Sequence, residues 1–192
     1  MKSNQEDVTL KKIIANSQDQ TLSLYEKDCL VKVFSGVSFG KNGVKKDKKE
    51  GDGCTPKGVF PLGFAFGMKR LDIEYPYYLV NEHIYWVSDV NSKYYNEWVE
   101  LTSEKKKFDY SYMKTSPVIA WEEAEHLTDY TKQYELAIVI AYNLEKEKGS
   151  GSAIFLHVQD KEYTSGCVAT TKENLEFILH WLGKEQGVIE IK

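Results

Sequence analysis

The run Ala153-Ile154-Phe155-Leu156-His157 and the turn Thr164-Ser165-Gly166-Cys167-Val168-Ala169 organise the rest of this chain. The apolar residues of the run predict a buried strand that ends at a histidine. A polar loop, residues 159–163, leads from this strand to the turn that carries Cys167. A rigid strand holds an imidazole in place, and Gly166 gives the backbone the freedom to present a sulfur atom. The pattern therefore predicts a thiol nucleophile beside its base.

A cysteine thiol needs help to react at neutral pH, because its ordinary pKa is about 8.5 and only a few per cent of it is thiolate. His157 is placed to accept the proton, which would leave a thiolate–imidazolium pair. The N–H groups of Gly166 and Cys167 would then face a developing oxyanion. Val158 cannot orient the imidazole through its side chain, so a backbone carbonyl is the expected partner of the ring. Alone, this pair is a weak motif, because buried cysteines are commonly inert.

Four sequence blocks in order resemble the L,D-transpeptidase catalytic-domain (YkuD-type) family, from about Lys41 to the C-terminus. The fourth block leads through the glycines before the strand to the family signature, a His at a strand end followed by Ser/Thr-x-Gly-Cys. The first block is Gly51-Asp52-Gly53-Cys54-Thr55-Pro56-Lys57-Gly58-Val59-Phe60, and the second is Trp86-Val87-Ser88-Asp89 with Ser92, Tyr95 and Asn96. The third block is Tyr142-Asn143, and the fourth starts at Gly149. Many members carry a second His directly before the Gly-Cys pair. This chain has Ser165 there, which leaves His157 as the nearby base.

The resemblance implies a mainly β fold with minor α, a single-domain β-sandwich with a helix after the nucleophile. Residues 1–40 would be N-terminal strands of the same domain, and residues 41–192 the catalytic domain. The implied catalytic residues are Cys167, His157, Gly166 and Ser165, and the implied substrate-binding residues are Asn143, Tyr142, Trp86 and Tyr95. The implied activity is acyl transfer between peptidoglycan stem peptides through a thioester, which a carbapenem would block. Two alternatives stay open, an L,D-carboxypeptidase and an inert cell-wall-binding module.

Composition narrows the possible partners. The chain has 192 residues, a net charge of −4, and 13 Tyr, 8 Phe and 4 Trp, which suits one β-rich domain with a cleft. No basic field suits nucleic acid, no Walker or dinucleotide motif suits a nucleotide, and no apolar run is long enough for a membrane span. We expect a monomer without cofactor or metal. A zinc site of Cys167, His157, His126 and an acid lacks paired ligand spacing.

Cysteine use and the N-terminus leave the compartment open. The residues 1–8 are polar and contain no signal-peptide core, so the protein is either cytosolic or exported with a signal outside this sequence. The resemblance implies the second, a periplasmic or cell-wall location. Of Cys29, Cys54 and Cys167, at least one is unpaired in a monomer, and we expect all three to be reduced.

Local patterns predict strands throughout and one helix. Leu175, Ile178, Leu179 and Leu182 recur at helical spacing, with Thr170 or Thr171 as the cap and Gly183 or Gly187 at the end. This helix would place Cys167 near a positive helix terminus. A polar segment, residues 122–133, has a possible helical period. The lysine-rich segment 45–49 is expected to be a solvated loop. Strands are predicted over residues 11–16 (with a helix as the alternative), 21–27, 30–37, 58–66, 84–87, 117–121, 136–141 and 187–191.

Overall fold

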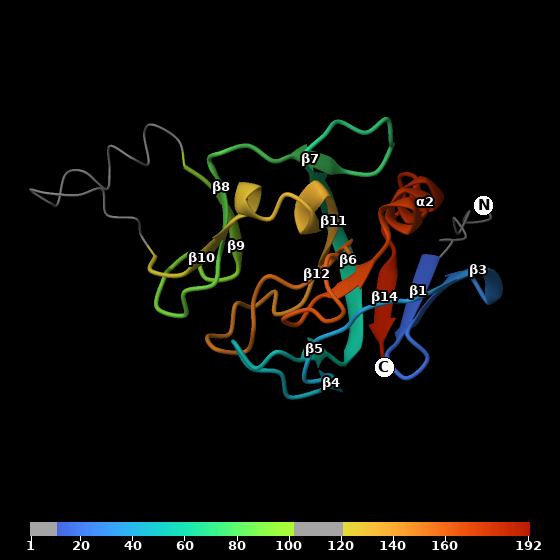
Figure 1. Ribbon diagram of the computed structural model, residues 1–192, viewed down its shortest axis with the longest axis horizontal. Coiled ribbons are helices and arrows are strands. Elements are labelled where there is room, and N and C mark those ends of the chain that lie inside the picture. Colours follow the sequence, from blue (N-terminus) through green and yellow to red (C-terminus); the bar gives the residue numbers. More distant parts are fainter. Residues whose placement is uncertain (1–10, 102–120) are drawn as a thin grey trace, which may run out of the picture.

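The computed structural model of the protein describes residues 11–101 and 121–192 (Figure 1). Its strands are β1 (Lys11–Asn16), β2 (Thr21–Glu26), β3 (Cys29–Ser35), β4 (Val44–Lys45), β5 (Thr55–Pro56), β6 (Gly58–Gly67), β7 (Tyr77–Leu79), β8 (Ile84–Val87), β9 (Glu97–Glu100), β10 (Ala124–His126), β11 (Leu136–Ile140), β12 (Phe155–Val158), β13 (Val168–Thr170) and β14 (Val188–Ile191). Its helices are α2 (Lys172–Leu182) and two 3-10 turns, η1 (Leu127–Asp129) and η2 (Gln133–Glu135). The predicted strand at residues 117–121 falls almost wholly outside the described residues.

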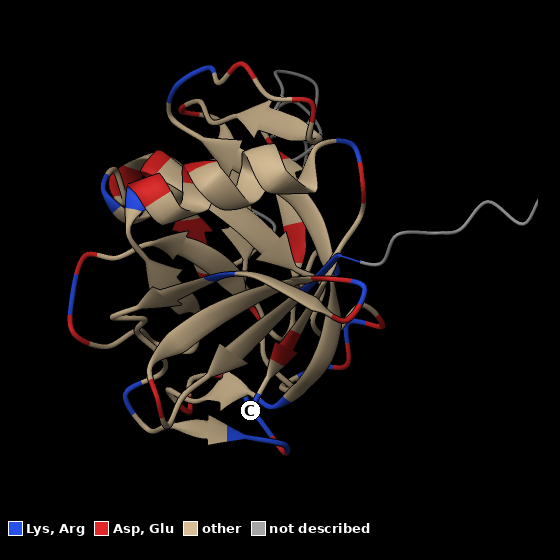
Figure 2. Cartoon of the chain, turned by 90° about the vertical axis from the view of Figure 1, so that its right-hand side faces the viewer, with Lys and Arg blue, Asp and Glu red and all other residues tan. Residues whose placement is uncertain are grey.

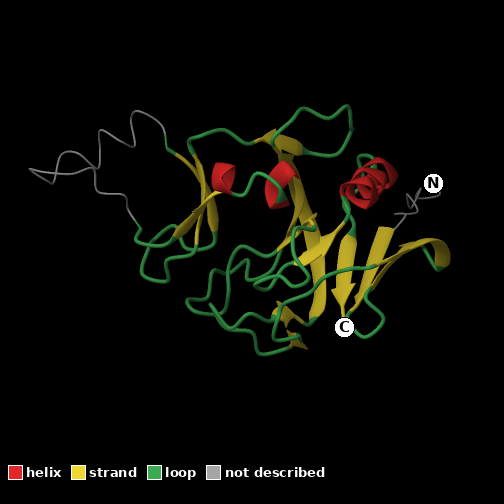
Figure 3. Ribbon diagram, in the orientation of Figure 1, coloured by secondary structure: helices red, strands yellow, loops and turns green. Residues whose placement is uncertain are grey.

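The long strand β6 connects the two halves of the main sheet. Its first residues, 58–61, pair antiparallel with β14, and its later residues, 62–67, pair antiparallel with β11. From β11 the sheet continues through β12 to β13, and from β14 it continues through β1 and β2 to β3, while β7 pairs with β6. This nine-stranded, curled sheet confirms the predicted mainly β fold, and α2 is the α-helix of the described residues (Figure 3).

Helix α2 covers the sheet with the face that the sequence predicts. Leu175, Ile178, Leu179 and Leu182 are fully buried, in one core cluster with residues of β1, β2, β6, β11 and β14. Thr171 caps the helix by accepting a hydrogen bond from the Asn174 N–H at 3.3 Å, and Gly183, with φ of 58°, ends it. Charged residues of both signs lie mainly in the loops and on α2 (Figure 2).

Two local expectations are wrong. Strand β13 separates Cys167 from α2, because residues 168–170 pair in parallel with β12 instead of joining the helix. The helix dipole therefore does not begin at the cysteine. Residues 122–133 form β10 and η1 rather than an α-helix, because β10 completes a three-stranded sheet with β8 and β9. Among the described residues, none of the helices has the length and apolarity that crossing a bilayer requires.

Candidate active site

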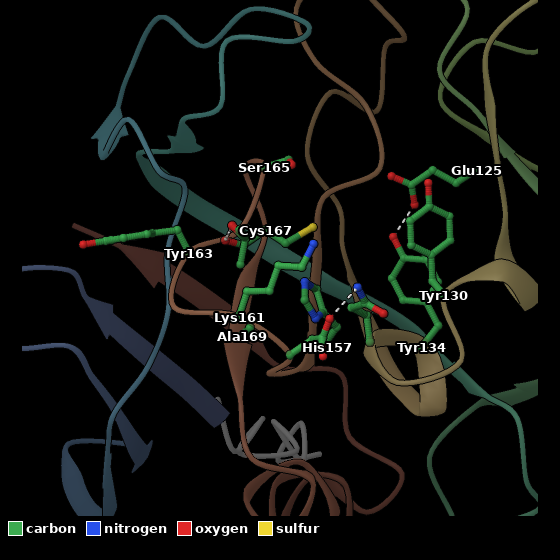
Figure 4. Close-up of a pocket in the computed structure, with 12 residues that line it drawn as sticks. Glu125, Tyr130, Tyr134, His157, Lys161, Tyr163, Ser165, Cys167 and Ala169 are labelled. Carbon is green, nitrogen blue, oxygen red and sulfur yellow. Dashed lines mark hydrogen bonds between the residues drawn. The ribbon is translucent and has the colours of Figure 1, made fainter.

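Two neighbouring parallel strands bring the predicted nucleophile and base together. His157 is in β12 and lies opposite Ala169 of β13, and Cys167 directly precedes β13. Both side chains line one cavity of about 180 Å³ (Figure 4). The strand, the loop and the small-residue turn therefore lie as the sequence predicts, with Cys167 and His157 facing the same space.

The Cys167 thiol is held in its neutral form. It donates a hydrogen bond to the Ala153 carbonyl, with Sγ 3.2 Å from the oxygen, and Sγ lies 3.3 Å from the Phe155 backbone nitrogen, which donates to it. Burial raises the pKa of the thiol to about 12, the Glu125 carboxylate adds to the rise, and the Lys48 ammonium opposes it. The expected resting thiolate–imidazolium pair is therefore wrong for this structure, because burial outweighs the charge that would stabilise a thiolate.

His157 is oriented as a base. Its Nδ1 lies 2.8 Å from the Val158 carbonyl oxygen, and a carbonyl can only accept, so Nδ1 carries the proton and Nε2 is the basic nitrogen. Burial lowers the pKa of the imidazole below 6.5, which keeps the ring neutral near pH 7. Tyr134 packs edge-on against the ring, with 5.9 Å between centroids. The sequence led us to expect a backbone carbonyl as the orienting partner, and the structure identifies it as that of Val158.

The turn at Cys167 is fixed by two threonine hydroxyls. Thr164 and Thr55 donate to the Cys167 carbonyl at 2.7 and 3.0 Å, and the Gly166 N–H donates back to the Thr164 hydroxyl at 3.1 Å. The Gly166 N–H is therefore already engaged. This corrects the expectation that Gly166 and Cys167 both offer their N–H groups to an oxyanion, and it leaves Cys167 as the backbone donor of that pair.

A second cavity adjoins Cys167. It measures about 170 Å³, and its lining includes Lys48, Glu50 and Gly166. Glu125, Ser165 and Cys167 line this cavity and the 180 Å³ cavity alike. The predicted site residue Ser165 thus lines both cavities together with Cys167, and Cys167 lies where the two cavities adjoin.

Glu125 and Lys48 are residues of the site that sequence reasoning missed. Glu125 lies on β10, and its carboxylate accepts a hydrogen bond from the Tyr134 hydroxyl (Figure 4). Burial raises the pKa of Glu125 to about 7. Nothing in the charged segment around Glu125 sets it apart from Glu122 or Glu123.

Lys48 is buried, which makes the expected solvated loop wrong at this position. Its side chain is only 3% exposed, and its Nζ donates to Asp52 Oδ1 at 3.0 Å and to the Lys49 carbonyl at 3.3 Å. Asp52 also accepts the N–H groups of Lys49 and Cys54, and these hydrogen bonds, with the nearby lysines, hold the pKa of its carboxyl well below 3.8 despite burial. The sequence feature that could have pointed to the buried Lys48 is Asp52, which lies in a Gly-Asp-Gly turn four residues after it.

The predicted substrate-binding residues hold residues 149–153, which form the wall behind Cys167. Trp86 Nε1 donates to Asn96 Oδ1 at 3.0 Å, and the same oxygen accepts the Ala153 N–H at 3.2 Å. The Tyr95 hydroxyl donates to Glu50 and accepts the Gly151 N–H at 3.0 Å.

Tyr142 and Asn143 support the same wall from its other side. Tyr142 donates to the Ser150 carbonyl at 2.7 Å, and Asn143 donates to the Gly151 carbonyl at 2.9 Å. Both also line an open hollow beside the lysine-rich segment. The four predicted residues therefore hold residues 149–153 in place and lie outside the linings of the two cavities at Cys167.

The remaining candidates are accounted for locally. The nitrogens of His126 lie 3.0 Å from Asp129 Oδ1 and from the Glu82 carbonyl oxygen, so its ring is already engaged. Within residues 11–101 and 121–192, no group of three or more His, Cys, Asp or Glu side chains is placed to hold a metal. Cys29, Cys54 and Cys167 are all unpaired, which confirms the expected reduced state.

The chain belongs to the L,D-transpeptidase catalytic-domain (YkuD) family, whose sequence profile matches residues 10–191. Its fold is similar to that of the helical cell shape determining protein Pgp2 from Campylobacter jejuni, with 16% identity and a TM-score of 0.54 over 97% of this chain. The K307A mutant of Pgp2 matches with a TM-score of 0.53 and the same identity and coverage, and Bdellovibrio bacteriovorus Bd1075 with 0.49, at 14% identity over 98% of this chain.

This chain spans about half the length of these solved relatives, 48% of each Pgp2 chain and 50% of Bd1075. A search of the curated proteins finds no match.

Proposed function

We propose that the protein is a cysteine-dependent acyl transferase that acts on peptidoglycan stem peptides and forms cross-links through a thioester. The observation that carries this proposal is that Cys167 and His157 line one cavity, in a chain of the L,D-transpeptidase family. The bond attacked would be the amide between the L centre of a diamino acid and a terminal D-alanine. Cys167 is the nucleophile and His157 the base.

The reaction starts from a neutral pair. As sulfur approaches the substrate carbonyl, the thiol proton passes to His157 Nε2, and the hydrogen bond from Nδ1 to the Val158 carbonyl stabilises the imidazolium that forms. The C–S bond forms, and the carbonyl π electrons move to oxygen. When the carbonyl re-forms, the C–N bond breaks and the imidazolium gives its proton to the leaving amine. The neutral thiol would thus ionise only during attack.

The two cavities beside Cys167 give room for a donor and an acceptor on different sides of the sulfur. The side-chain amine of a second stem peptide would resolve the thioester and release the free thiol. Product analysis with two stem peptides tests this step. Cross-linked dimers support the transpeptidase, and shortened monomers alone would make the protein an L,D-carboxypeptidase.

Intact mass spectrometry after incubation with a carbapenem tests the nucleophile. We expect one covalent adduct on the wild-type protein and none on Cys167→Ala. Cys29→Ala is the matched control, because Cys29 is an exposed thiol outside the site, and it should form the adduct normally. An unmodified wild-type protein would overturn the proposal in favour of an inert wall-binding module. A Cys167→Ala protein that still forms the adduct would overturn the assignment of Cys167 as the nucleophile.

The substrate also suggests where the protein works. We propose a periplasmic or cell-wall location, a role in cell shape like that in the name of Pgp2, and a monomer that needs no cofactor. Cell fractionation with an antibody against the protein tests the location. A purely cytosolic signal would contradict it.

A further inference from the structure

The turn that carries the nucleophile has fewer backbone donors for an oxyanion than its sequence predicts. The Gly166 N–H donates to the Thr164 hydroxyl, which itself donates to the Cys167 carbonyl. Releasing the Gly166 N–H would disturb the contact that fixes the cysteine. An oxyanion that forms at Cys167 would therefore need a second donor from another part of the chain.

Lys48 lies where such a donor is needed. A Cβ atom added to Gly166 would lie 3.2 Å from Lys48 Nζ, so the ammonium sits against the backbone just before Cys167. Lys48 also lines the 170 Å³ cavity together with Gly166 and Cys167. The position thus joins a buried positive charge to the cavity in which the reacting carbonyl of a substrate would lie.

The loop around Lys48 fixes the position of this charge. Nζ donates to Asp52 and to the Lys49 carbonyl, which uses two of the three N–H bonds of the ammonium and leaves one for a ligand. Asp52 is held in turn by the N–H groups of Lys49 and Cys54. Lys45 also pairs with Asp52 at 3.2 Å, so two lysines share one carboxylate and the cluster keeps a net positive charge. A charge held rigidly before substrate arrives is the arrangement that stabilises a developing anion.

We propose that Lys48 is a catalytic residue whose ammonium, together with the Cys167 N–H, stabilises the oxyanion of the tetrahedral intermediate. This inference deepens the proposed function and rests on it. In the step concerned, the C–S bond forms, the carbonyl π pair becomes the oxyanion lone pair, and the third N–H of Lys48 donates to that oxygen. Collapse returns the electron pair to the carbonyl and breaks the C–N bond, so Lys48 gives up no proton.

Two reactions of the same thiol test this role. Acylation by a carbapenem develops an oxyanion, whereas alkylation by iodoacetamide does not. In Lys48→Met we expect the second-order acylation rate constant to fall by roughly 10²-fold, as for the loss of one oxyanion donor. Alkylation should slow by less than about tenfold, the effect of one pKa unit on the thiolate fraction. Lys48→Arg, which keeps a charged donor, should recover part of the acylation rate.

Matched variants keep the test decisive. Lys46→Met removes an exposed lysine of the same loop and should leave both rates unchanged. If the loss of one of the two lysine partners of Asp52 unfolds Lys48→Met, the variant Lys48→Met/Asp52→Asn removes both charges of the buried pair, and circular dichroism establishes its fold before the rates are measured. This double variant should show the same selective loss of acylation.

The possible results separate the two proposals. A wild-type protein that forms no carbapenem adduct defeats the proposed function itself. A wild-type protein that reacts, with acylation undiminished in Lys48→Met, defeats the role of Lys48 alone. An equal loss in acylation and alkylation would also overturn this role, because Lys48 would then act on the thiol and not on the oxyanion.

Discussion

Glu125 and Tyr134 share a hydrogen bond in the wall of the 180 Å³ cavity, and the Glu125 carboxylate raises the pKa of Cys167. We therefore expect Glu125→Gln to lower the pKa of the thiol and to speed alkylation by iodoacetamide at pH 8.5, by roughly threefold to tenfold. Because the pKa of Glu125 is about 7, the wild-type and variant rates should converge below pH 7, where the carboxyl is protonated. Glu123→Gln, at an exposed neighbour, is the control. Equal rates at pH 8.5 would contradict the prediction.

His157 should set the acid limb of the acylation rate. Burial lowers the pKa of the imidazole, so the ring stays neutral, and able to accept a proton, below pH 6.5. The rate of adduct formation with a carbapenem should hold as pH falls to 6.5 and decline only below it. His157→Asn should lose this limb together with roughly 10²-fold or more of the rate. A limb centred above pH 6.5 would show that another group is the base.

Asp52 should contribute to stability above its unfolded pKa and lose that contribution in acid. Its pKa is lowered in the folded protein, so the unfolded chain binds a proton more readily as pH falls through about 4. Asp52→Asn should cost about 3 kcal/mol of unfolding free energy at pH 7, because it strips the buried Lys48 of its partner. The cost should shrink steadily below pH 4. Urea unfolding at a series of pH values measures this, with exposed Asp47→Asn as the control.

The Tyr95 hydroxyl should stabilise the wall behind Cys167. Tyr95→Phe removes the hydroxyl that bonds Glu50 and the Gly151 N–H, and it leaves these partners without their bond in a buried region. We expect a loss of about 1–3 kcal/mol in stability, together with slower acylation by a carbapenem. Thermal unfolding measures the first effect. Tyr78→Phe, whose residue is 55% exposed, should change neither quantity, and an unchanged Tyr95→Phe would show that the wall does not depend on this hydroxyl.

Periodicity predicted most of the described fold. The apolar run of β11 and the leucine pattern of α2 are strong local signals. Strand β11 lies within one residue of the expected bounds, and α2 is capped by Thr171 and ends at Gly183, one of the two caps and one of the two ends that the sequence left open. The same reasoning failed for residues 122–133, because β10 is a strand through its pairing with β8, which is distant in sequence. The assignment of residues 1–40 as N-terminal strands of the same domain as residues 41–192 stays a prediction.

For the candidate site, the sequence predicted that Cys167 and His157 lie beside each other, and it missed Lys48 and Glu125, which line the cavities beside Cys167. Cys167 and His157 could be predicted because each lies in a short, continuous stretch of sequence that indicates a strand or a turn. Lys48 and Glu125 lie in charged segments where neighbours have the same residue type, and only the fold decides which of them lines the cavities at Cys167. Trp86 and Tyr95 belong to the family-like blocks, yet in the structure they hold the backbone near Cys167 through Asn96 and Gly151.

Because β12 pairs in parallel with β13, the proposed reaction depends on the register of these two strands. His157 faces Ala169 in the native register, and a shift of one position would turn its imidazole to the opposite side of the sheet. A chain misaligned in this way could stay compact and well packed in much of its core while its proposed base, His157, faced away from Cys167. Selection on activity would therefore act directly on the short loop between the two strands, whose length sets that alignment.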